Sequence, residues 1–182
     1  MKKAIILLAD GFEQSEALVT HDILLRSKQI DVKLVTINKS KEVLASSGLK
    51  IEADLTLSEL NNVDEYDFLV LPGGMPGVKN LYSSYFAMEL IKTFIKNKRH
   101  VHAICAAPFI LGSIGYLDDK SYTCFPSFET GKGRHLQEGV VVDKNTVTGK
   151  AMGYSTEFGL NIVRLEINED TANGVKKSIL GE

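Results

Sequence analysis

The chain has 182 residues, of which 44% are hydrophobic and 24% are charged, and its formal net charge at pH 7 is −2. This length predicts one α/β domain over residues 1–182, and the near-neutral charge argues against nucleic acid or a membrane surface as a partner. No stretch reaches the ~20 apolar residues needed to cross a bilayer, and the apolar start ends at Asp10 without a cleavage pattern. We therefore expect a cytoplasmic protein.

Strand-like and helix-like patterns alternate along the chain, which is typical of a doubly wound, mostly parallel sheet with helices on both faces. The expected strands are residues 3–9, 32–37, 67–72, 100–104, 121–125, 140–143 and 146–149. The expected helices are residues 13–28, 88–96, 109–114, 158–163 and 171–180. Residues 43–53 predict a hairpin at the sheet edge, and residues 57–60 form a short helix at most.

Three loops follow strands that are predicted to end at the same edge of this sheet. They are residues 10–16, 73–77 and 105–108. Ligands of open α/β sheets bind at the carboxyl ends of the strands, where the connections diverge to opposite faces. We therefore expect the functional site at this edge.

Cys105 lies where the strand over 100–104 turns into the helix that starts at 109. A thiol near the positive end of a helix favours the thiolate, which is the reactive form, so this position predicts a lowered pKa. The alternative is a buried apolar filler, which describes most free cysteines. From this window alone the two interpretations carry equal weight.

The first loop and the middle loop offer groups that could act on the Cys105 sulfur. Gly73 and Gly74 give a backbone that can approach a ligand closely, and with the Ala106 N–H it could hold an oxyanion. Residues 73–77 are expected to open a loop, and a tight structural turn is the alternative. Glu13 and Glu16 are three residues apart, so one can face the sheet edge while the other caps the helix. A carboxyl group beside the sulfur would be protonated and donate a hydrogen bond to it.

The remaining cysteine and the four histidines predict neither a disulfide framework nor a metal site. Cys105 and Cys124 are too few and too far apart for a metal knuckle, and no HExxH motif occurs. His100 and His102 on one face of a strand could form half a site. We expect no metal and no other cofactor.

Four sequence blocks together resemble one known family. They are Ala-Asp-Gly-Phe-Glu-Gln-Ser-Glu at 9–16, Val-Leu-Pro-Gly-Gly at 70–74, Ala-Ile-Cys-Ala-Ala-Pro at 103–108 and Ser-Thr-Glu-Phe at 155–158. They span nearly the whole chain in the expected order. The chain is similar to the ThiJ/PfpI superfamily, in its DJ-one-like branch, the parkinsonism-associated deglycase-like proteins.

The resemblance implies a flavodoxin-like sandwich, as in class I glutamine amidotransferases, that forms a homodimer through the helix over 15–26. It implies that Cys105 is the nucleophile or an oxidation-sensitive thiol and that Glu16 touches its sulfur. Gly73, Gly74 and Ala106 match the backbone positions around the pocket. Family members are credited with glyoxalase or deglycase activity on reactive carbonyls and glycated proteins or amines, and with redox sensing and chaperone-like behaviour. More distant relatives are peptidases.

The chain departs from the family pattern at several positions. Phe125 stands where many relatives have a histidine that reaches toward the cysteine, so Glu16 has to supply the proton transfer. His102 and His135 are possible substitutes, Glu13 is a possible accessory group, and Cys124 could resolve an oxidised Cys105. Ala106 stands where peptidases have histidine, and Gly48 stands where the family often has an anion-binding arginine.

Two hypotheses follow for the function. The first is an enzyme in which the Cys105 thiolate attacks a small reactive carbonyl with the help of Glu16. The second is a non-catalytic oxidative-stress sensor or chaperone in which Glu16 stabilises an oxidised Cys105. An intracellular cysteine peptidase is a weaker alternative.

Overall fold

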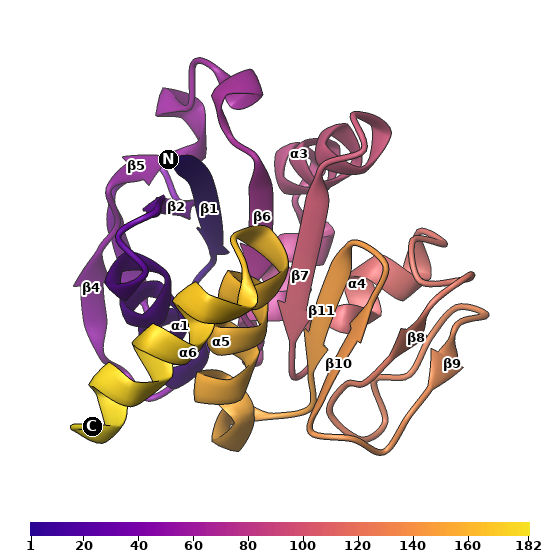
Figure 1. Cartoon of the computed structure of the whole chain (residues 1–182). Helices are drawn as coiled ribbons and strands as arrows, with labels where there is room; N and C mark the ends of the chain where they lie inside the picture. The colour runs from indigo at the N-terminus through magenta and orange to yellow at the C-terminus, as the bar shows by residue number, and fades with distance from the viewer.

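A central seven-stranded sheet organises the computed structural model, which describes all of residues 1–182 (Figure 1). The strand order is β10-β11-β7-β6-β1-β2-β5, and every neighbouring pair is parallel except β10 with β11. The strands are β1 (Lys2–Leu8), β2 (Ile30–Thr36), β5 (Leu55–Thr56), β6 (Phe68–Leu71), β7 (His100–Ile104), β10 (Val140–Asp143) and β11 (Thr146–Gly149). The predicted doubly wound, mostly parallel sheet is confirmed.

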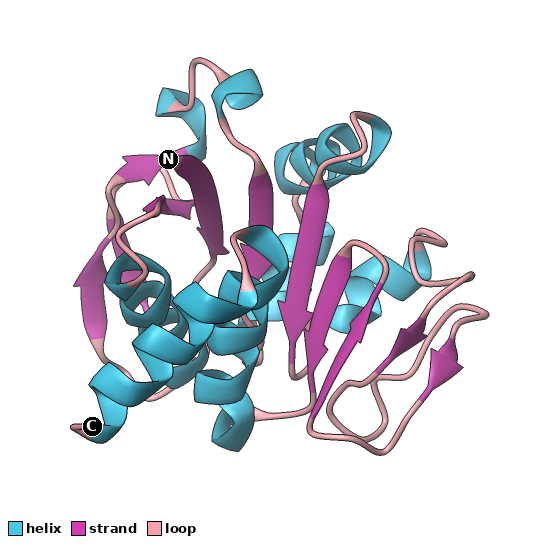
Figure 2. Cartoon of the chain, in the orientation of Figure 1, coloured by secondary structure: helices cyan, strands magenta, loops and turns pink.

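Helices cover both faces of the sheet (Figure 2). One layer holds α1 (Gln14–Arg26), α5 (Ser155–Glu166) and α6 (Glu169–Leu180), and the other holds α2 (Gly77–Ser83), α3 (Tyr85–Lys96) and α4 (Pro108–Ser113). Strand β1 shows why both layers form. Its residues Ala4, Ile6 and Leu8 pack into one hydrophobic cluster, whereas Ile5 and Leu7 pack into the other. A strand buried on two sides needs apolar residues throughout, and that is the continuous run seen in the sequence.

Smaller elements complete the chain, and some differ from the predicted ones. They are β3 (Glu42–Leu44), β4 (Lys50–Glu52), β8 (Ser121–Tyr122), β9 (Arg134–His135) and the short 3-10 helices η1 (Leu57–Glu59), η2 (Val63–Glu65) and η3 (Met152–Tyr154). The predicted hairpin exists as β3 and β4, but it forms a two-stranded sheet of its own. Helix α2 begins at Gly77, directly after the glycine-rich loop, where the sequence indicated no helix.

The strand predicted over 121–125 ends early because its backbone groups find other partners. Tyr122 pairs with His135 of β9. The N–H of Thr123 donates to the hydroxyl of Thr148 at 3.0 Å, and the N–H of Phe125 donates to the carbonyl of Cys105 at 2.8 Å. This detour brings the segment after β8 against the end of β7.

The strand order places the three loops singled out from the sequence side by side. Strands β7, β6 and β1 are consecutive neighbours, and all three run in the same direction. The connections diverge at β1, which pairs with β2 on one side and with β6 on the other. The loops after β1, β6 and β7 therefore meet at the carboxyl edge, as expected for an open α/β sheet.

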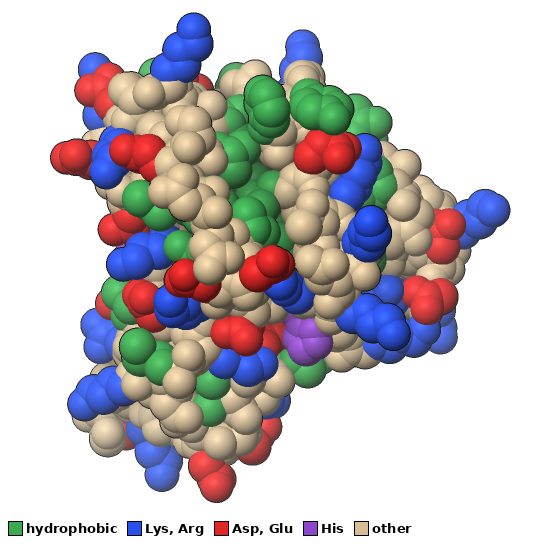
Figure 3. Space-filling view, turned by 90° about the horizontal axis from the view of Figure 1, so that it is seen from above, with side chains coloured by type: hydrophobic (Ala, Val, Ile, Leu, Met, Phe, Trp, Pro, Cys, Tyr) green, Lys and Arg blue, Asp and Glu red, His purple; other side chains and the backbone are tan.

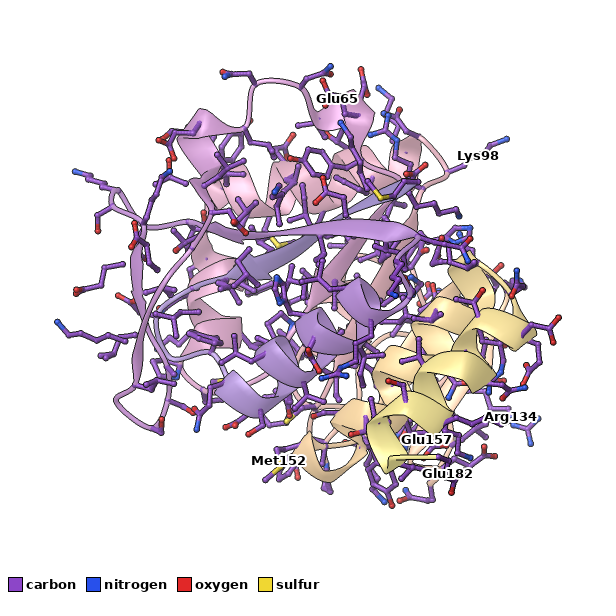
Figure 4. All side chains as sticks on the ribbon, turned by 60° about the vertical axis from the view of Figure 1, so that its left-hand side comes forward. Glu65, Lys98, Arg134, Met152, Glu157 and Glu182 are labelled. Atoms are coloured by element: carbon purple, nitrogen blue, oxygen red, sulfur yellow. The ribbon has the colours of Figure 1, made fainter.

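The opposite edge of the molecule carries a mixed surface. Seen from above, acidic and basic side chains alternate around a group of apolar side chains (Figure 3). Glu65 and Lys98 project outward near this end, while Met152 and Glu157 lie toward the other end (Figure 4). No helix has the length and apolar character that a membrane span requires. The face seen in Figure 3 shows no large patch of one charge sign.

Candidate active site

Cys105 occupies a strained turn at the end of β7. Its φ angle is 62°, in the left-handed region that residues other than glycine rarely adopt. Its N–H donates to the carbonyl of Gly149 at 2.8 Å, and its own carbonyl accepts the N–H of Phe125 at 2.8 Å. Because both partners come from other parts of the chain, the surrounding fold holds the strained backbone in place. The side chain is partly buried.

Glu16 lies in the first turn of α1 and points at the same place. The residue is 1% exposed, and its Oε2 accepts the N–H of Gly73 at 2.7 Å. Its Oε1 has no hydrogen bond of normal geometry, yet the Cys105 sulfur lies close enough to influence the pKa of the carboxyl group. Three loops thus bring a thiol, a buried carboxyl group and a backbone donor together.

Gly73 separates the thiol from the carboxyl group without filling the space between them. A Cβ at this position would lie 2.6 Å from the Cβ of Cys105 and 2.7 Å from Oε2 of Glu16. Both distances are shorter than van der Waals contact. Glycine at this position therefore permits the close approach of the two functional side chains.

Burial dominates the protonation of both groups. Burial raises the pKa of Glu16 to about 7, although hydrogen bonding with Cys105 and with the Gly73 N–H lowers it in part. Burial also raises the pKa of the Cys105 thiol to about 12, and the neighbouring Glu16 carboxylate adds to this rise. The N–H groups of Ala106 and Gly74 oppose it. While Glu16 is ionised, the proton stays on sulfur.

The expectation of a lowered thiol pKa is wrong for this resting site. Helix α4 is only 6 residues long and begins at Pro108, beyond the intervening Ala106 and Ala107. A short helix at that distance does not offset desolvation and the adjacent negative charge. A carboxyl group with a pKa of about 7, that of Glu16, lies beside this thiol.

Gly74 and Ala106 lie where an oxyanion would need donors. Their N–H groups are close enough to the Cys105 sulfur to lower its pKa. Gly74 has a φ of 91°, and a Cβ there would lie 2.3 Å from the backbone nitrogen of Glu13. Only glycine fits this position, and the loop after β6 holds the Gly74 N–H near the sulfur while the turn after β7 holds that of Ala106.

Glu13 takes the capping role that the sequence left open between the two glutamates. It is the N-cap of α1, and its carboxylate accepts the N–H of Ser15 at 3.2 Å and the hydroxyl of Ser46 at 3.1 Å. Its charge raises the pKa of Glu16 slightly further. Glu13 therefore shapes the electrostatics of Glu16 and does not face the thiol itself.

His102 is not an accessory group of Cys105, contrary to the alternative drawn from the sequence. It is fully buried, and its Nε2 lies 3.1 Å from Oε1 of Glu166. Its Nδ1 accepts the N–H of Val147 at 3.0 Å, so the ring proton is on Nε2. His100 Nδ1 and Lys2 Nζ contact the same carboxylate at 2.5 Å and 2.7 Å. These contacts form a polar anchor that the sequence did not reveal, because Glu166 is distant along the chain.

Glu166 brings a third potential metal ligand to the half site at His100 and His102. A neutral imidazole has one free lone pair, and that of His102 is already used at Nδ1. The Glu166 carboxylate is held by three donors. These donors explain why the pKa of Glu166 is far below its usual range despite burial. The group suits an ion pair and not a metal.

Phe125 lies beside Cys105, as the family resemblance implies. Phe125 is 43% exposed. An apolar hollow of about 300 Å³ opens between the Gly74 loop and the segment after Phe125. It is lined by Met75, Val78, Lys79, Tyr82, Phe109, Ser127 and Phe128. Cys105 and Glu16 do not line this hollow, although Met75 directly follows the Gly74 that lies beside the thiol.

Cys124 and His135 lie near each other in the segment around β8 and β9. Cys124 is buried, and burial raises the pKa of its thiol to about 12. Glu129 completes this group, and the sequence analysis did not single it out. The spacing of Glu129 from Cys124 and His135 along the chain is not periodic, so no sequence pattern pointed to this residue.

Comparison with known proteins agrees with this arrangement. The model of the DJ-1/PfpI family matches residues 2–165. Protein DJ-1 homolog B of Arabidopsis thaliana is 35% identical over 87% of the chain, which spans 36% of that longer protein. The glutathione-independent glyoxalase DJR-1.2 of Caenorhabditis elegans is 30% identical over 98% of the chain and 96% of its own length. The solved structure of a DJ-1 superfamily protein from Salmonella typhimurium has a TM-score of 0.91 and 31% identity, with 99% of this chain and 98% of that one covered. The chain belongs to the DJ-1/PfpI family.

Proposed function

We propose that this protein is a glutathione-independent glyoxalase that converts small α-oxoaldehydes such as methylglyoxal into 2-hydroxy acids. The observation that carries the proposal is the pairing of Cys105 with Glu16, a buried carboxyl group whose pKa of about 7 suits a general base at neutral pH. The C. elegans relative that bears the name glyoxalase matches over nearly its whole length, which supports the same activity.

The first step forms a carbon–sulfur bond. The ionised Glu16 takes the proton from the Cys105 thiol as the sulfur attacks the aldehyde carbon. The C=O electron pair moves onto oxygen, and the N–H groups of Gly74 and Ala106 donate to the resulting oxyanion. Glu16 passes the proton that it took from sulfur to this oxygen, which gives a hemithioacetal and leaves Glu16 ionised for the next step. The raised pKa of the thiol is compatible with this step because the proton has an acceptor beside it.

The second step moves hydrogen between adjacent carbons. Glu16 removes the proton from the carbon that bears sulfur and returns it to the neighbouring carbonyl carbon through an enediol. This isomerisation leaves a thioester on Cys105 and a hydroxyl group on the next carbon. Water then cleaves the thioester, which releases the 2-hydroxy acid and restores the thiol, so no outside oxidant or reductant is required. With Phe125 in place of a histidine, Glu16 carries every proton transfer near the sulfur.

The test is lactate formation from methylglyoxal by the purified protein. We expect the Cys105→Ser and Glu16→Gln variants each to lose at least ~100-fold in kcat/KM, in line with removal of a nucleophile or a base. Glu52→Gln, at an exposed position on β4, serves as the matched carboxyl control and should keep wild-type activity. Wild-type turnover by Cys105→Ser would contradict the proposal.

The pH dependence gives a separate check on the base. Since Glu16 must be ionised to take the thiol proton, kcat/KM should rise with pH and reach half its plateau near pH 7. The range from pH 5.5 to pH 8.5 extends about 1.5 pH units to each side of this pKa. A kcat/KM that is constant over this range would rule out Glu16 as the base.

Phe125 favours a second candidate, an oxidation sensor, because the histidine that would share the proton transfers is missing. In this case Glu16 in its protonated form donates a hydrogen bond to a sulfinate on Cys105. Mass spectrometry after mild peroxide treatment should find two added oxygens on Cys105 and none on the buried Cys124. Equal oxidation of the two cysteines would remove this candidate.

A further inference from the structure

A second cluster of chemically active side chains lies outside the Cys105 site. Cys124, Glu129 and His135 each place one donor atom within 4.8 Å of those of the other two. The segment between β8 and β9 brings them together, since Tyr122 pairs with His135 across the two strands. Arg134 is exposed at the surface (Figure 4). Neighbouring residues of a strand point to opposite sides, so His135 faces the interior of this segment.

The donor atoms of this cluster have unused capacity. Nε2 of His135 is buried and has no hydrogen-bond partner, and Nδ1 lies 3.9 Å from Oε1 of Glu129, beyond hydrogen-bond distance. Cys124 is 1% exposed, so its sulfur is also withdrawn from solvent. A buried polar atom without a hydrogen-bond partner is uncommon in a native protein, and a bound ion is one explanation for it.

The polar anchor around Glu166 differs from this cluster in its hydrogen bonding. There the carboxylate has three donors, and His102 uses both ring nitrogens, so His102 has no lone pair left for a cation. In the cluster of Cys124, Glu129 and His135, no side-chain hydrogen bond competes for the donor atoms. The two groups contain similar residue types. They differ because the polar atoms of the first group are hydrogen-bonded to one another, whereas those of the second group form no side-chain hydrogen bond.

We propose that Cys124, Glu129 and His135 form a binding site for a zinc ion. Thiolate, imidazole and carboxylate are the three ligand types that Zn²⁺ accepts in proteins, and three protein ligands leave a fourth position for water. In a tetrahedral site the ligand atoms are about 3.3–3.6 Å apart, as follows from Zn–ligand distances near 2.0–2.3 Å. The cluster, whose donor atoms lie within 4.8 Å of one another, therefore has to contract by at most about 1.5 Å. Glu129, whose side chain is 40% exposed, has the freedom to do so.

Binding involves one proton and no redox change. Cys124 is a buried free thiol in the metal-free protein. A coordinated zinc ion deprotonates such a thiol, so the Zn–S bond forms as one proton leaves for solvent. His135 binds as neutral imidazole and Glu129 as carboxylate.

A metal at this position would fix the segment that flanks the active site. Cys124 is followed by Phe125, whose N–H donates to the carbonyl of Cys105. The ligands themselves do not include Cys105 or Glu16. Zinc binding is therefore separable from the proposed glyoxalase chemistry, and failure of one proposal does not affect the other.

The experiment is titration of the metal-free protein with Co²⁺ and then Zn²⁺ in a Cys105→Ser background, which removes the other thiol. We expect one equivalent of Co²⁺ to bind with thiolate-to-cobalt charge-transfer absorption, and Zn²⁺ to displace it. Adding Cys124→Ser should abolish this absorption and weaken Zn²⁺ binding at least ~100-fold, while His135→Gln should weaken it at least ~10-fold. Glu129→Gln should have the smaller effect, because the amide oxygen is a weaker ligand.

A matched histidine control separates this site from the anchor. His100→Gln should leave Co²⁺ and Zn²⁺ binding unchanged, since His100 belongs to the group around Glu166. Circular dichroism checks that each variant is folded, and His135→Gln decides the matter if the Cys124 variant does not fold. Lack of saturable binding in the Cys105→Ser protein, or equal binding after loss of Cys124, would overturn the proposal.

Discussion

At the scale of single residues, the site depends on backbone positions that tolerate close approach. Cys105 keeps a left-handed backbone because Gly149 and Phe125 hold its N–H and carbonyl groups. Gly73 leaves room for a thiol and a carboxyl group to face each other. The chemistry then follows from burial, which brings the pKa of Glu16 to about 7 and so makes it a base suited to neutral pH.

Glu16→Gln should stabilise the protein above neutral pH while it removes activity. The folded-state pKa of Glu16 is raised from 4.5 to about 7, so its contribution to stability is fully present below pH 4.5 and is lost as pH rises through 7. The glutamine has no proton to lose and can still accept the Gly73 N–H. We expect a gain on the order of 3 kcal/mol in the free energy of unfolding at pH 8, and little gain at pH 4.5.

Urea unfolding of the two proteins at pH 4.5, 6 and 8 measures this difference. A difference that does not grow with pH would show that the carboxyl group keeps an ordinary pKa in the folded protein. The exposed Glu52→Gln variant is the control and should show no such pH dependence.

Gly73→Ala should damage the site directly. The added Cβ would lie 2.6 Å from the Cβ of Cys105 and 2.7 Å from Oε2 of Glu16, so one of them must move. We expect at least ~10-fold loss of kcat/KM and a stability loss of about 1–3 kcal/mol, as for other overpacked positions. Gly153→Ala is the matched control because no atom lies within 4 Å of its Cβ position. Kinetics and thermal unfolding that are unchanged in Gly73→Ala would contradict the tight packing.

At the scale of elements, β7 connects two polar groups of different kinds. Its carboxyl end leads into the Cys105 turn, while His100 and His102 along its length contact Glu166 at the end of α5. Lys2 at the start of β1 reaches the same carboxylate. One buried charge thus joins α5 to two strands whose other ends build the active site.

Glu166→Gln should destabilise the protein by about 3–5 kcal/mol near pH 7, which is typical of a broken buried ion pair. The pKa of Glu166 is depressed, so its contribution is fully present above the unfolded-state pKa of about 4.5 and is lost only as pH falls toward the much lower folded-state pKa. The difference between the variant and the wild type should therefore persist at pH 4 and shrink only in stronger acid. Urea unfolding at pH 7, at pH 4 and in stronger acid measures this, with the exposed Glu169→Gln as control. Equal stability at pH 7 would mean that the three donors contribute nothing.

At the scale of the whole molecule, the strand order decides where the site lies. Strands β7, β6 and β1 are neighbours in the middle of the sheet, and helices bury both faces. Three loops that are distant in the sequence therefore emerge side by side from the most protected part of the fold. A rigid support of this kind holds the Cys105 thiol and the buried Glu16 carboxyl group in fixed positions, as the proposed chemistry requires.

Amide hydrogen exchange should show that the central strands are better protected than the outer hairpin. We expect the amides of β1, β6 and β7 to exchange at least ~100-fold more slowly than those of β3 and β4, which form a separate two-stranded sheet. Exchange measured by mass spectrometry or NMR checks it. Equal protection of the hairpin and the central strands would contradict a single cooperative core around the sheet.

The homodimer implied by the family resemblance stays a prediction at this scale. Sedimentation velocity of the purified protein measures it, and charged substitutions on the exposed face of α1, such as Leu25→Asp, should shift a dimer to monomer. A monomer at all concentrations tested would remove the prediction.

The sequence by itself determined the alternation of strands and helices and the three loops at the carboxyl edge, and it singled out Cys105 together with one of two glutamates, Glu13 or Glu16. These are local patterns: apolar runs, glycine pairs and a strand that turns into a helix. Only the tertiary structure decided that Glu16 and not Glu13 faces the thiol, that burial raises the thiol pKa, and that His102 belongs to Glu166. It also brought Cys124, Glu129 and His135 together. Desolvation and charge pairing depend on what lies within a few ångströms in space, and the order of residues along the chain does not encode that directly.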